Sequence, residues 1–167
     1  VLAHGTVSQL GFMFVLFGLG TPYAVTAGCV LLLAHAAFKA SLFMSVGVVD
    51  RTLSTRDATE LPRIGGAWPV FAGVSVVSAA SMAGIPLTSG FIGKWAVFEV
   101  ALSAGAWPVV VVALVTSIVA AFFYVRVIVY MYFAEPIGAG PTVTHPSVLT
   151  AATVALCAAA TLVLGVL

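Results

Sequence analysis

Charge is scarce in this sequence, and the scarcity decides the class of protein. Only 7% of the 167 residues are charged, with six Lys and Arg against five Asp and Glu, whereas a soluble domain has about 25% charged residues. Hydrophobic residues make up 62% of the chain, and the mean hydropathy is +1.23. Because so few polar side chains cannot cover a water-exposed surface, we expect an all-α integral membrane protein. The sequence also lacks the basic stripe that would indicate nucleic-acid binding.

Motifs for disulfides, metals and cofactors are missing as well. Cys29 and Cys157 both lie in apolar runs, which is typical of small buried side chains and not of a disulfide framework. The three histidines have no zinc-type spacing, and the sequence has no GxGxxG motif, no CxxC motif and no pair of haem ligands. We therefore expect no metal and no cofactor in this chain. There is no signal-peptide pattern, and the sequence opens at Val1 inside apolar residues, so we expect a C-terminal fragment of a longer membrane protein.

Apolar runs predict a single transmembrane bundle of about six helices. The expected spans are residues 6–20, 23–49, 69–84, 87–103, 107–133 and 146–167.

The third and fourth of these spans follow from a length argument. As one helix, residues 69–103 would be about 52 Å long, whereas the hydrocarbon core of a bilayer is about 30 Å thick. We therefore expect two spans with a break at GIPLTSG, where Pro86 and two glycines interrupt the run. Irregular backbone at membrane depth is tolerated only when it is buried in protein or lines a water-filled cavity.

A polar loop is expected over residues 50–66. It holds six of the eleven formal charges, three of them arginines. The arginines favour the cytoplasmic side for this loop by the positive-inside rule.

Two ionisable residues lie deep in the second span. Lys39 comes 11 residues before Asp50, which places it about 16 Å from the polar end of the helix. That is too deep for its side chain to reach water easily. A charged lysine at such depth costs about 2.5–3.5 kcal/mol, and it usually faces protein or water and marks an ion or proton path. His35, four residues earlier, lies on the same helical face. Because histidine titrates near neutrality, we expect the pair to pass a proton along the helix; the alternative for His35 is a plain hydrogen bond to a neighbouring helix.

Lys94 is the second intramembrane lysine, and it follows the expected break. It lies about 10 Å into its span if that span begins near Leu87. The break offers free backbone groups and room for water, as a proton path requires. The alternative is a lysine whose head reaches the membrane surface.

Glu99 and Arg126 are weaker candidates. Glu99 is about 140° round the helix from Lys94, so we expect it to pair with another helix or to reach the interface. Arg126 lies in the aromatic-rich run FFYVRVIVYMYF, which is typical of an interface belt, and we interpret it as an anchor.

Two motifs resemble one family of membrane proteins. The stretches AHAAFKASLFMSVGVVD (34–50) and TRD (55–57) resemble the antiporter-like subunits that respiratory complex I shares with the multisubunit Mrp sodium/proton antiporters. SMAGIPLTSGFIGK (81–94) resembles the second lysine-bearing motif of the same superfamily. The stretch from His35 to Asp57 is most similar to the A-type subunit of Mrp or the L-type subunit of complex I, and the chain from Gly84 onward resembles the N-type subunit of bacterial NADH:quinone oxidoreductase.

The resemblance implies the fold and the roles of the lysines. It implies the second five-helix repeat and the last helix of a fourteen-helix subunit. Lys39 then matches the lysine that connects to the central polar axis, Lys94 the terminal lysine that leads to the proton exit, and His35 the histidine that precedes the first lysine. Quinone, flavin and Fe–S clusters would belong to other subunits. The partners implied are other membrane subunits, lipid, protons and, in an antiporter, sodium.

Three functions follow from these observations. The first is proton translocation by the N-type subunit of NADH:quinone oxidoreductase in the bacterial cytoplasmic membrane. The second is an A- or D-type component of an Mrp sodium/proton antiporter, which is driven by an ion gradient and has no redox reaction. The third is a structural bundle whose lysines only anchor helices.

Overall fold

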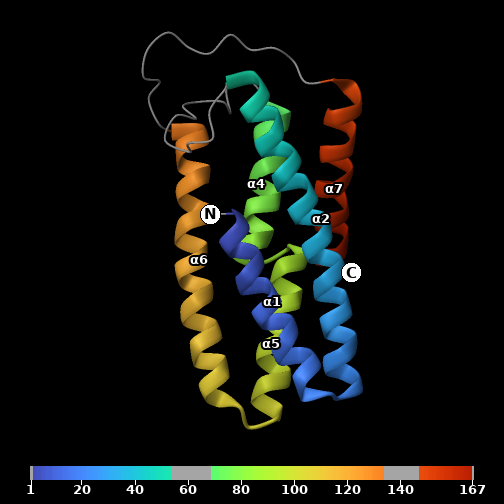
Figure 1. Ribbon diagram of the computed structural model, residues 1–167, viewed down its shortest axis with the longest axis vertical. Helices are drawn as coiled ribbons and strands as arrows, with labels where there is room; N and C mark the ends of the chain where they lie inside the picture. The colour runs from blue at the N-terminus through green and yellow to red at the C-terminus, as the bar shows by residue number, and fades with distance from the viewer. Residues whose placement is uncertain (1, 54–68, 134–146, 167) are drawn as a thin grey trace.

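The computed structural model describes residues 2–53, 69–133 and 147–166, and these residues form six α-helices. The fold is all-helical with a break at GIPLTSG, as the sequence predicts. The helices are α1 (Leu2–Leu19), α2 (Pro22–Leu53), α4 (Pro69–Ala83), α5 (Ser89–Ser103), α6 (Trp107–Phe133) and α7 (Val148–Val166) (Figure 1). Most of the expected polar loop lies outside the described residues.

Local sequence explains where the first two helices meet. Gly20 has φ +65°, a left-handed conformation that glycine adopts without steric cost and that commonly ends a helix. Thr21 then caps α2, because its Oγ1 accepts a hydrogen bond from the Ala24 N–H at 3.2 Å. Pro22 occupies the first position of α2, where its missing N–H is harmless.

Four of the described helices are long and apolar enough to cross a membrane: α1, α2, α6 and α7. α4 and α5 have 15 residues each, about 22 Å of helix, which is less than the hydrocarbon thickness of about 30 Å. In Figure 1 they follow each other along the long axis, with α4 in the upper half and α5 in the lower half. Together they run the length that α2 and α6 each run alone, so the break lies at mid-height in the bundle.

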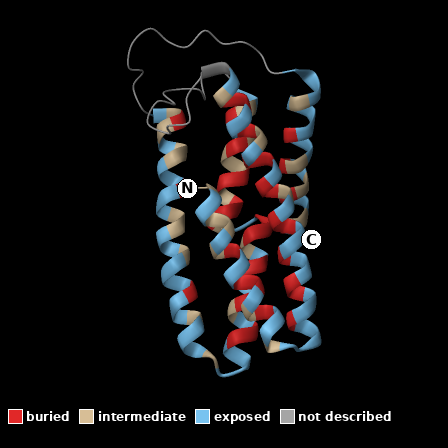
Figure 2. Cartoon of the chain, in the orientation of Figure 1, coloured by how far each residue is buried: buried red, intermediate tan, exposed pale blue. Residues whose placement is uncertain are grey.

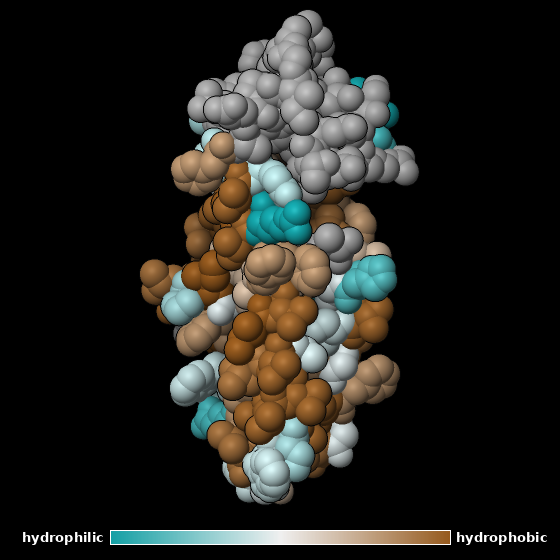
Figure 3. Space-filling model, turned by 90° about the vertical axis from the view of Figure 1, so that its left-hand side faces the viewer, coloured by the Kyte–Doolittle hydropathy of each residue, from teal (hydrophilic) through white to brown (hydrophobic). Residues whose placement is uncertain are grey.

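The outside of the bundle is apolar. Of the 27 residues of α6, only Ala113, Tyr124 and Met131 are buried, and Figure 2 shows the outer helices largely exposed around a buried centre. In Figure 3 the side that α6 covers is mostly hydrophobic. Such a surface suits lipid or other membrane helices, because lipid chains are as apolar as leucine.

Because the outside of the bundle is apolar, the expectation that both cysteines are buried is wrong. Cys29 is exposed and Cys157 is half-buried, although both lie in apolar runs. An apolar run in a membrane helix does not tell which side faces inward, because the outward side is apolar too.

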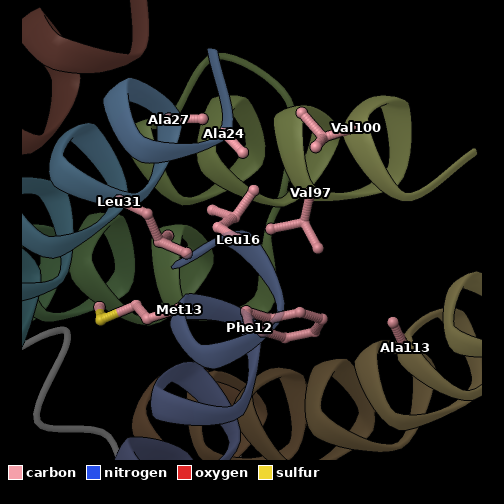
Figure 4. Packing of buried hydrophobic residues seen from close by; sticks show 9 residues of the cluster. All are labelled: Phe12, Met13, Leu16, Ala24, Ala27, Leu31, Val97, Val100 and Ala113. Carbon is pink, nitrogen blue, oxygen red and sulfur yellow. The ribbon is translucent and has the colours of Figure 1, made fainter. Parts of the chain in front are cut away.

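Two apolar clusters hold the bundle together. One joins α1, α2, α5 and α6 around Phe12, Leu16 and Leu31 (Figure 4). The other joins α2, α4 and α6 around Phe38, Met82 and Tyr124. The two lysines of the candidate site lie beside these clusters.

Candidate functional site

Lys94 lies on α5, and its side chain reaches back to the break between α4 and α5. Its side chain is 4% exposed, and its Nζ donates to the Met82 and Ala83 carbonyls at 3.1 and 2.9 Å. These are carbonyls of the last turn of α4, where a helix leaves acceptors without intrahelical donors and carries partial negative charge. The broken helix therefore supplies the acceptors that a buried ammonium needs.

The backbone of the break is built to admit this lysine. Gly84 has φ +84°, and a Cβ added there would lie 2.9 Å from Lys94 Cδ. Leu87 also has a positive φ, +71°, which is unusual for a residue other than glycine. Two glycine-like conformations thus turn the chain away from α4 and leave space for the side chain of Lys94.

Hydroxyl groups add further hydrogen bonds at the break. Ser81 Oγ accepts from the Gly90 N–H at 3.0 Å and lies 3.3 Å from Ser89 Oγ. Thr88 Oγ1 donates to the Ile85 carbonyl at 2.6 Å. The side of the break formed by Ser81, Thr88 and Ser89 is therefore a compact polar region that is buried in the bundle, whereas Ile85 and Leu87 are 41% and 73% exposed.

Lys39 lies on α2 and has a similar kind of partner. It is 7% exposed, and its Nζ donates to the Leu2 carbonyl of α1. Thr6 Oγ1 also bonds this carbonyl, at 3.4 Å, and the ring of Phe43 lies 5.3 Å from the Lys39 Nζ. Both lysines are thus buried against neutral backbone oxygens.

His35 lies one helical turn before Lys39 and is also buried. Its ring meets the ring of Phe38 edge-on, with centroids 5.2 Å apart. Its Nδ1 is buried and has no hydrogen-bond partner within the described part of the chain, so it is an unsatisfied polar atom one helical turn from Lys39.

Glu99 and Arg126 lie apart from the lysines. Glu99 Oε2 accepts a hydrogen bond from Tyr23 Oη of α2 at 3.0 Å, in an exposed position. Arg126 donates from Nε and Nη2 to Tyr130 Oη at 3.0 and 2.8 Å, also in an exposed position. Both side chains bond tyrosine hydroxyls on the outside of the bundle, and neither joins the buried polar site.

Sequence reasoning misses one buried hydroxyl and the pairing of the serines. Tyr124 is buried between α4 and α6, although its sequence context is typical of an interface belt. Ser78 of α4 donates to Ser41 of α2 at 2.9 Å. The serines at 75, 78 and 81 are three residues apart, and this spacing is the available signal for a common face.

Among the described residues, no group of three or more His, Cys, Asp and Glu is arranged to hold a metal ion. The polar site is therefore formed by lysines, hydroxyls and backbone carbonyls. Such groups can pass protons, because each ammonium and hydroxyl has a proton to donate and a neutral amine or a hydroxyl can accept one, while the carbonyls accept hydrogen bonds and hold the donors in place.

The sequence matches one protein family over most of its length. The family is described as NADH:quinone oxidoreductase/Mrp antiporter, transmembrane region, and the match covers residues 1–120. The chain belongs to this family. The matched region includes Lys39 and Lys94, and the resemblance drawn from the two lysine motifs is confirmed. The family match and the apolar helices both show that this chain is an integral membrane protein.

Several curated relatives carry the same name. The chain is 42% identical over 170 residues to NADH-quinone oxidoreductase subunit N of Thermobifida fusca (strain YX), a match that covers 100% of this chain and 31% of the relative. It is 44% identical to the protein of that name from Saccharopolyspora erythraea, with 100% and 33% covered. The chain therefore spans about a third of the length of these relatives.

Solved structures of both branches of the family share the fold. The Mrp complex from Dietzia sp. DQ12-45-1b matches with a TM-score of 0.88 and 26% identity, over 99% of this chain and 39% of that one. Respiratory complex I from Thermus thermophilus with bound aureothin matches with a TM-score of 0.59 and 23% identity, over 98% and 43%. The second likeness supports the fold alone.

Proposed function

We propose that this chain is part of the N-type antiporter-like subunit of NADH:quinone oxidoreductase and that it conducts protons through a membrane half-channel. The observation that carries the proposal is the burial of two lysines against backbone carbonyls inside an apolar bundle. A purely anchoring lysine would place its ammonium at the membrane surface. Lys39 and Lys94 keep theirs inside, at 7% and 4% exposure.

The mechanism follows from the neutral partners. A carboxylate partner would hold a lysine permanently charged, whereas a carbonyl stabilises the ammonium less strongly. Desolvation penalises the charged form, so each lysine can change between charged and neutral states. In this proposal Lys39 takes up a proton with the help of His35, one turn away, and Lys94 releases it beyond the break.

The hydrogen bonds of Lys94 couple its protonation state to the end of α4. When Lys94 loses its proton, the bonds to the Met82 and Ala83 carbonyls weaken, because a neutral amine is a poorer donor. The end of α4 is then free to exchange partners. Redox energy released elsewhere in the complex would act by favouring one of these states over the other.

The names of the relatives favour the complex I branch. The relatives named above as subunit N are 42% and 44% identical over the whole chain. The alternative is an A- or D-type component of a multisubunit Mrp sodium/proton antiporter, and the TM-score of 0.88 with the Mrp complex favours it.

The proposal extends to partners and place. The partners are other membrane subunits of a multisubunit complex, and quinone, flavin and Fe–S clusters belong to those other subunits. The transported ion is the proton, with sodium as well in the Mrp alternative. The site is in the bacterial cytoplasmic membrane.

Proton flux in inverted membrane vesicles tests the proposal. Vesicles carrying the full-length parent are compared with Lys39→Ala and Lys94→Ala, driven first by NADH and then by a sodium pulse. We expect NADH-driven acidification to fall in both variants, while Arg126→Ala, on the outside of α6, serves as a matched cation control and keeps it. A loss confined to the sodium-driven response would assign the chain to the Mrp branch. Unchanged flux in assembled lysine variants would reject a proton-carrying role.

A further inference from the structure

The inner side of α1 joins the surroundings of the two lysines. The Leu2 carbonyl of α1 accepts the Lys39 ammonium, and the Phe12 ring lies 5.9 Å from the Lys94 Nζ. Leu2, Gly5, Gln9 and Phe12 are three or four residues apart and share one side of the helix. From Leu2 to Phe12 this side measures about 15 Å.

Two buried polar groups lie along α1 between the surroundings of the two lysines, and one of them is the hydroxyl of Tyr124 of α6. Its side chain is 3% exposed, and its Oη has no hydrogen-bond partner among the described residues. A Cβ added at Gly5 would collide with this oxygen and with Met82 Cε. The hydroxyl therefore lies against α1 one turn from the carbonyl that binds Lys39, and beside the residue whose carbonyl binds Lys94.

The second polar group is Gln9, one turn farther along α1. It is 2% exposed, and its Oε1 also has no partner in the described ranges. Gln9 lies between Gly5, which contacts Tyr124, and Phe12, which contacts Lys94. Gln9 on α1 and Tyr124, which lies against α1 at Gly5, are thus both found along α1 between Leu2, whose carbonyl binds Lys39, and Phe12, whose ring lies near Lys94.

Unpartnered buried polar groups are costly, and internal water is the usual remedy where two or more such groups converge. We propose that Tyr124 and Gln9 hold internal waters that connect Lys39 to Lys94 along the inner side of α1. Each hydroxyl or water on this connection takes up one proton and releases another, so no group is consumed. The inference rests on the proposed function, since it assigns positioning residues to that proton transfer.

Gly5 gives this connection a second, independent test. Without a side chain it leaves room for the Tyr124 hydroxyl, and alanine would push the hydroxyl aside. Gly11 and Gly18 lie on the same helix with nothing within 4 Å of an added Cβ, so alanine there has no such effect. Tyr132, on the same helix as Tyr124, is the matched control for loss of a phenolic oxygen.

The experiment measures the rate of NADH-driven proton uptake, and its ratio to the rate of NADH oxidation, for the full-length parent in its complex in inverted vesicles. Because each lost hydrogen bond slows transfer by about tenfold, we expect Tyr124→Phe, Gln9→Leu and Gly5→Ala to lower proton flux by about that factor. NADH oxidation with an uncoupler stays unchanged, which a merely structural defect would not allow. Tyr132→Phe and Gly11→Ala keep the wild-type ratio.

The outcomes separate the inference from the proposed function. If Lys39→Ala and Lys94→Ala lower the flux but Tyr124→Phe and Gly5→Ala behave like their controls, the proposed function stands and the water connection is wrong. If the lysine variants themselves have no effect, the proposed function is wrong. Tyr124→Phe added to Lys39→Ala should cause no further loss, because groups on one path act as a unit, and fully additive losses would also contradict the connection.

Discussion

At the scale of single residues, the candidate site depends on what a buried ammonium is bonded to. Lys94 donates to two carbonyls at the end of α4, so it acts as a cap for that helix as well as a charge. Capping by a side chain is common at helix ends in water. Inside a membrane it matters more, because the carbonyls have no bulk water as an alternative partner.

This double role predicts a loss of stability when Lys94 loses its ammonium. Lys94→Met keeps a long apolar side chain and leaves the two carbonyls unpartnered, at about 1–3 kcal/mol for each unsatisfied group. We expect a lower free energy of unfolding, measured as a lower thermal midpoint of the detergent-solubilised parent. Arg126→Met is the control, because Arg126 bonds only an exposed tyrosine among the described residues. Equal midpoints for the two variants would show that the caps contribute nothing.

The sequence is sufficient to predict the lysines but not their partners. Lys39 and Lys94 stand out because a cation in an apolar run is rare and costly, and the structure places both inside the bundle. Their acceptors are backbone carbonyls of Leu2, Met82 and Ala83, and every residue has such a carbonyl, so no side-chain pattern indicates them.

At the scale of helices, the break is held in place by its neighbours. α7 presents a side of small or branched residues to the bundle, made of Val154, Ala158, Thr161 and Gly165. A Cβ at Gly165 would lie 2.5 Å from the Thr88 carbonyl carbon and 2.6 Å from the Ser89 nitrogen. The end of α7 therefore packs directly on the backbone of the break, at its α5 side.

Gly165→Ala should displace this backbone. The neighbouring atoms belong to the main chain and cannot rotate away, so overpacking should cost about 1–3 kcal/mol. We expect a lower thermal midpoint and a lower NADH-driven proton flux, since the break holds Lys94. Gly18→Ala, with nothing within 4 Å of the added Cβ, should be neutral or slightly stabilising, because alanine favours helix. A Gly165→Ala variant as stable and active as Gly18→Ala would argue against contact between α7 and the break.

The helices also show where reasoning from length falls short. The proline and the two glycines of GIPLTSG correctly predict the break between the helices. The length of residues 69–103 predicts two spans, yet α2 alone has 32 residues, about 48 Å. Length therefore does not separate one long span from two short ones, because helices extend beyond the hydrocarbon core. The order of α4 above α5 comes from their packing against the same long neighbours.

At the scale of the whole molecule, apolar side chains cover most of the outside, and buried polar groups lie inside beside the two apolar clusters, whereas a soluble domain has a polar outside. The bundle also has two distinct ends. The α1–α2 and α5–α6 connections lie at one end, and the end of α2 lies at the other (Figure 1). The arginines that follow α2 favour the cytoplasm for that second end.

Cysteine labelling measures this arrangement directly. In the full-length parent with Cys29, Cys157 and every cysteine outside residues 1–167 replaced by alanine, the variants Arg51→Cys and Ala104→Cys place single thiols at exposed positions at the two ends. A membrane-impermeant maleimide should label Ala104→Cys in intact spheroplasts and Arg51→Cys in inverted vesicles, because the hydrocarbon core separates the two positions. The opposite pattern would keep the fold and reverse its orientation. Labelling of both thiols from one side would contradict the placement of α4 and α5 in series, since a chain that leaves α2 at one surface must then cross once to reach residue 104 at the other.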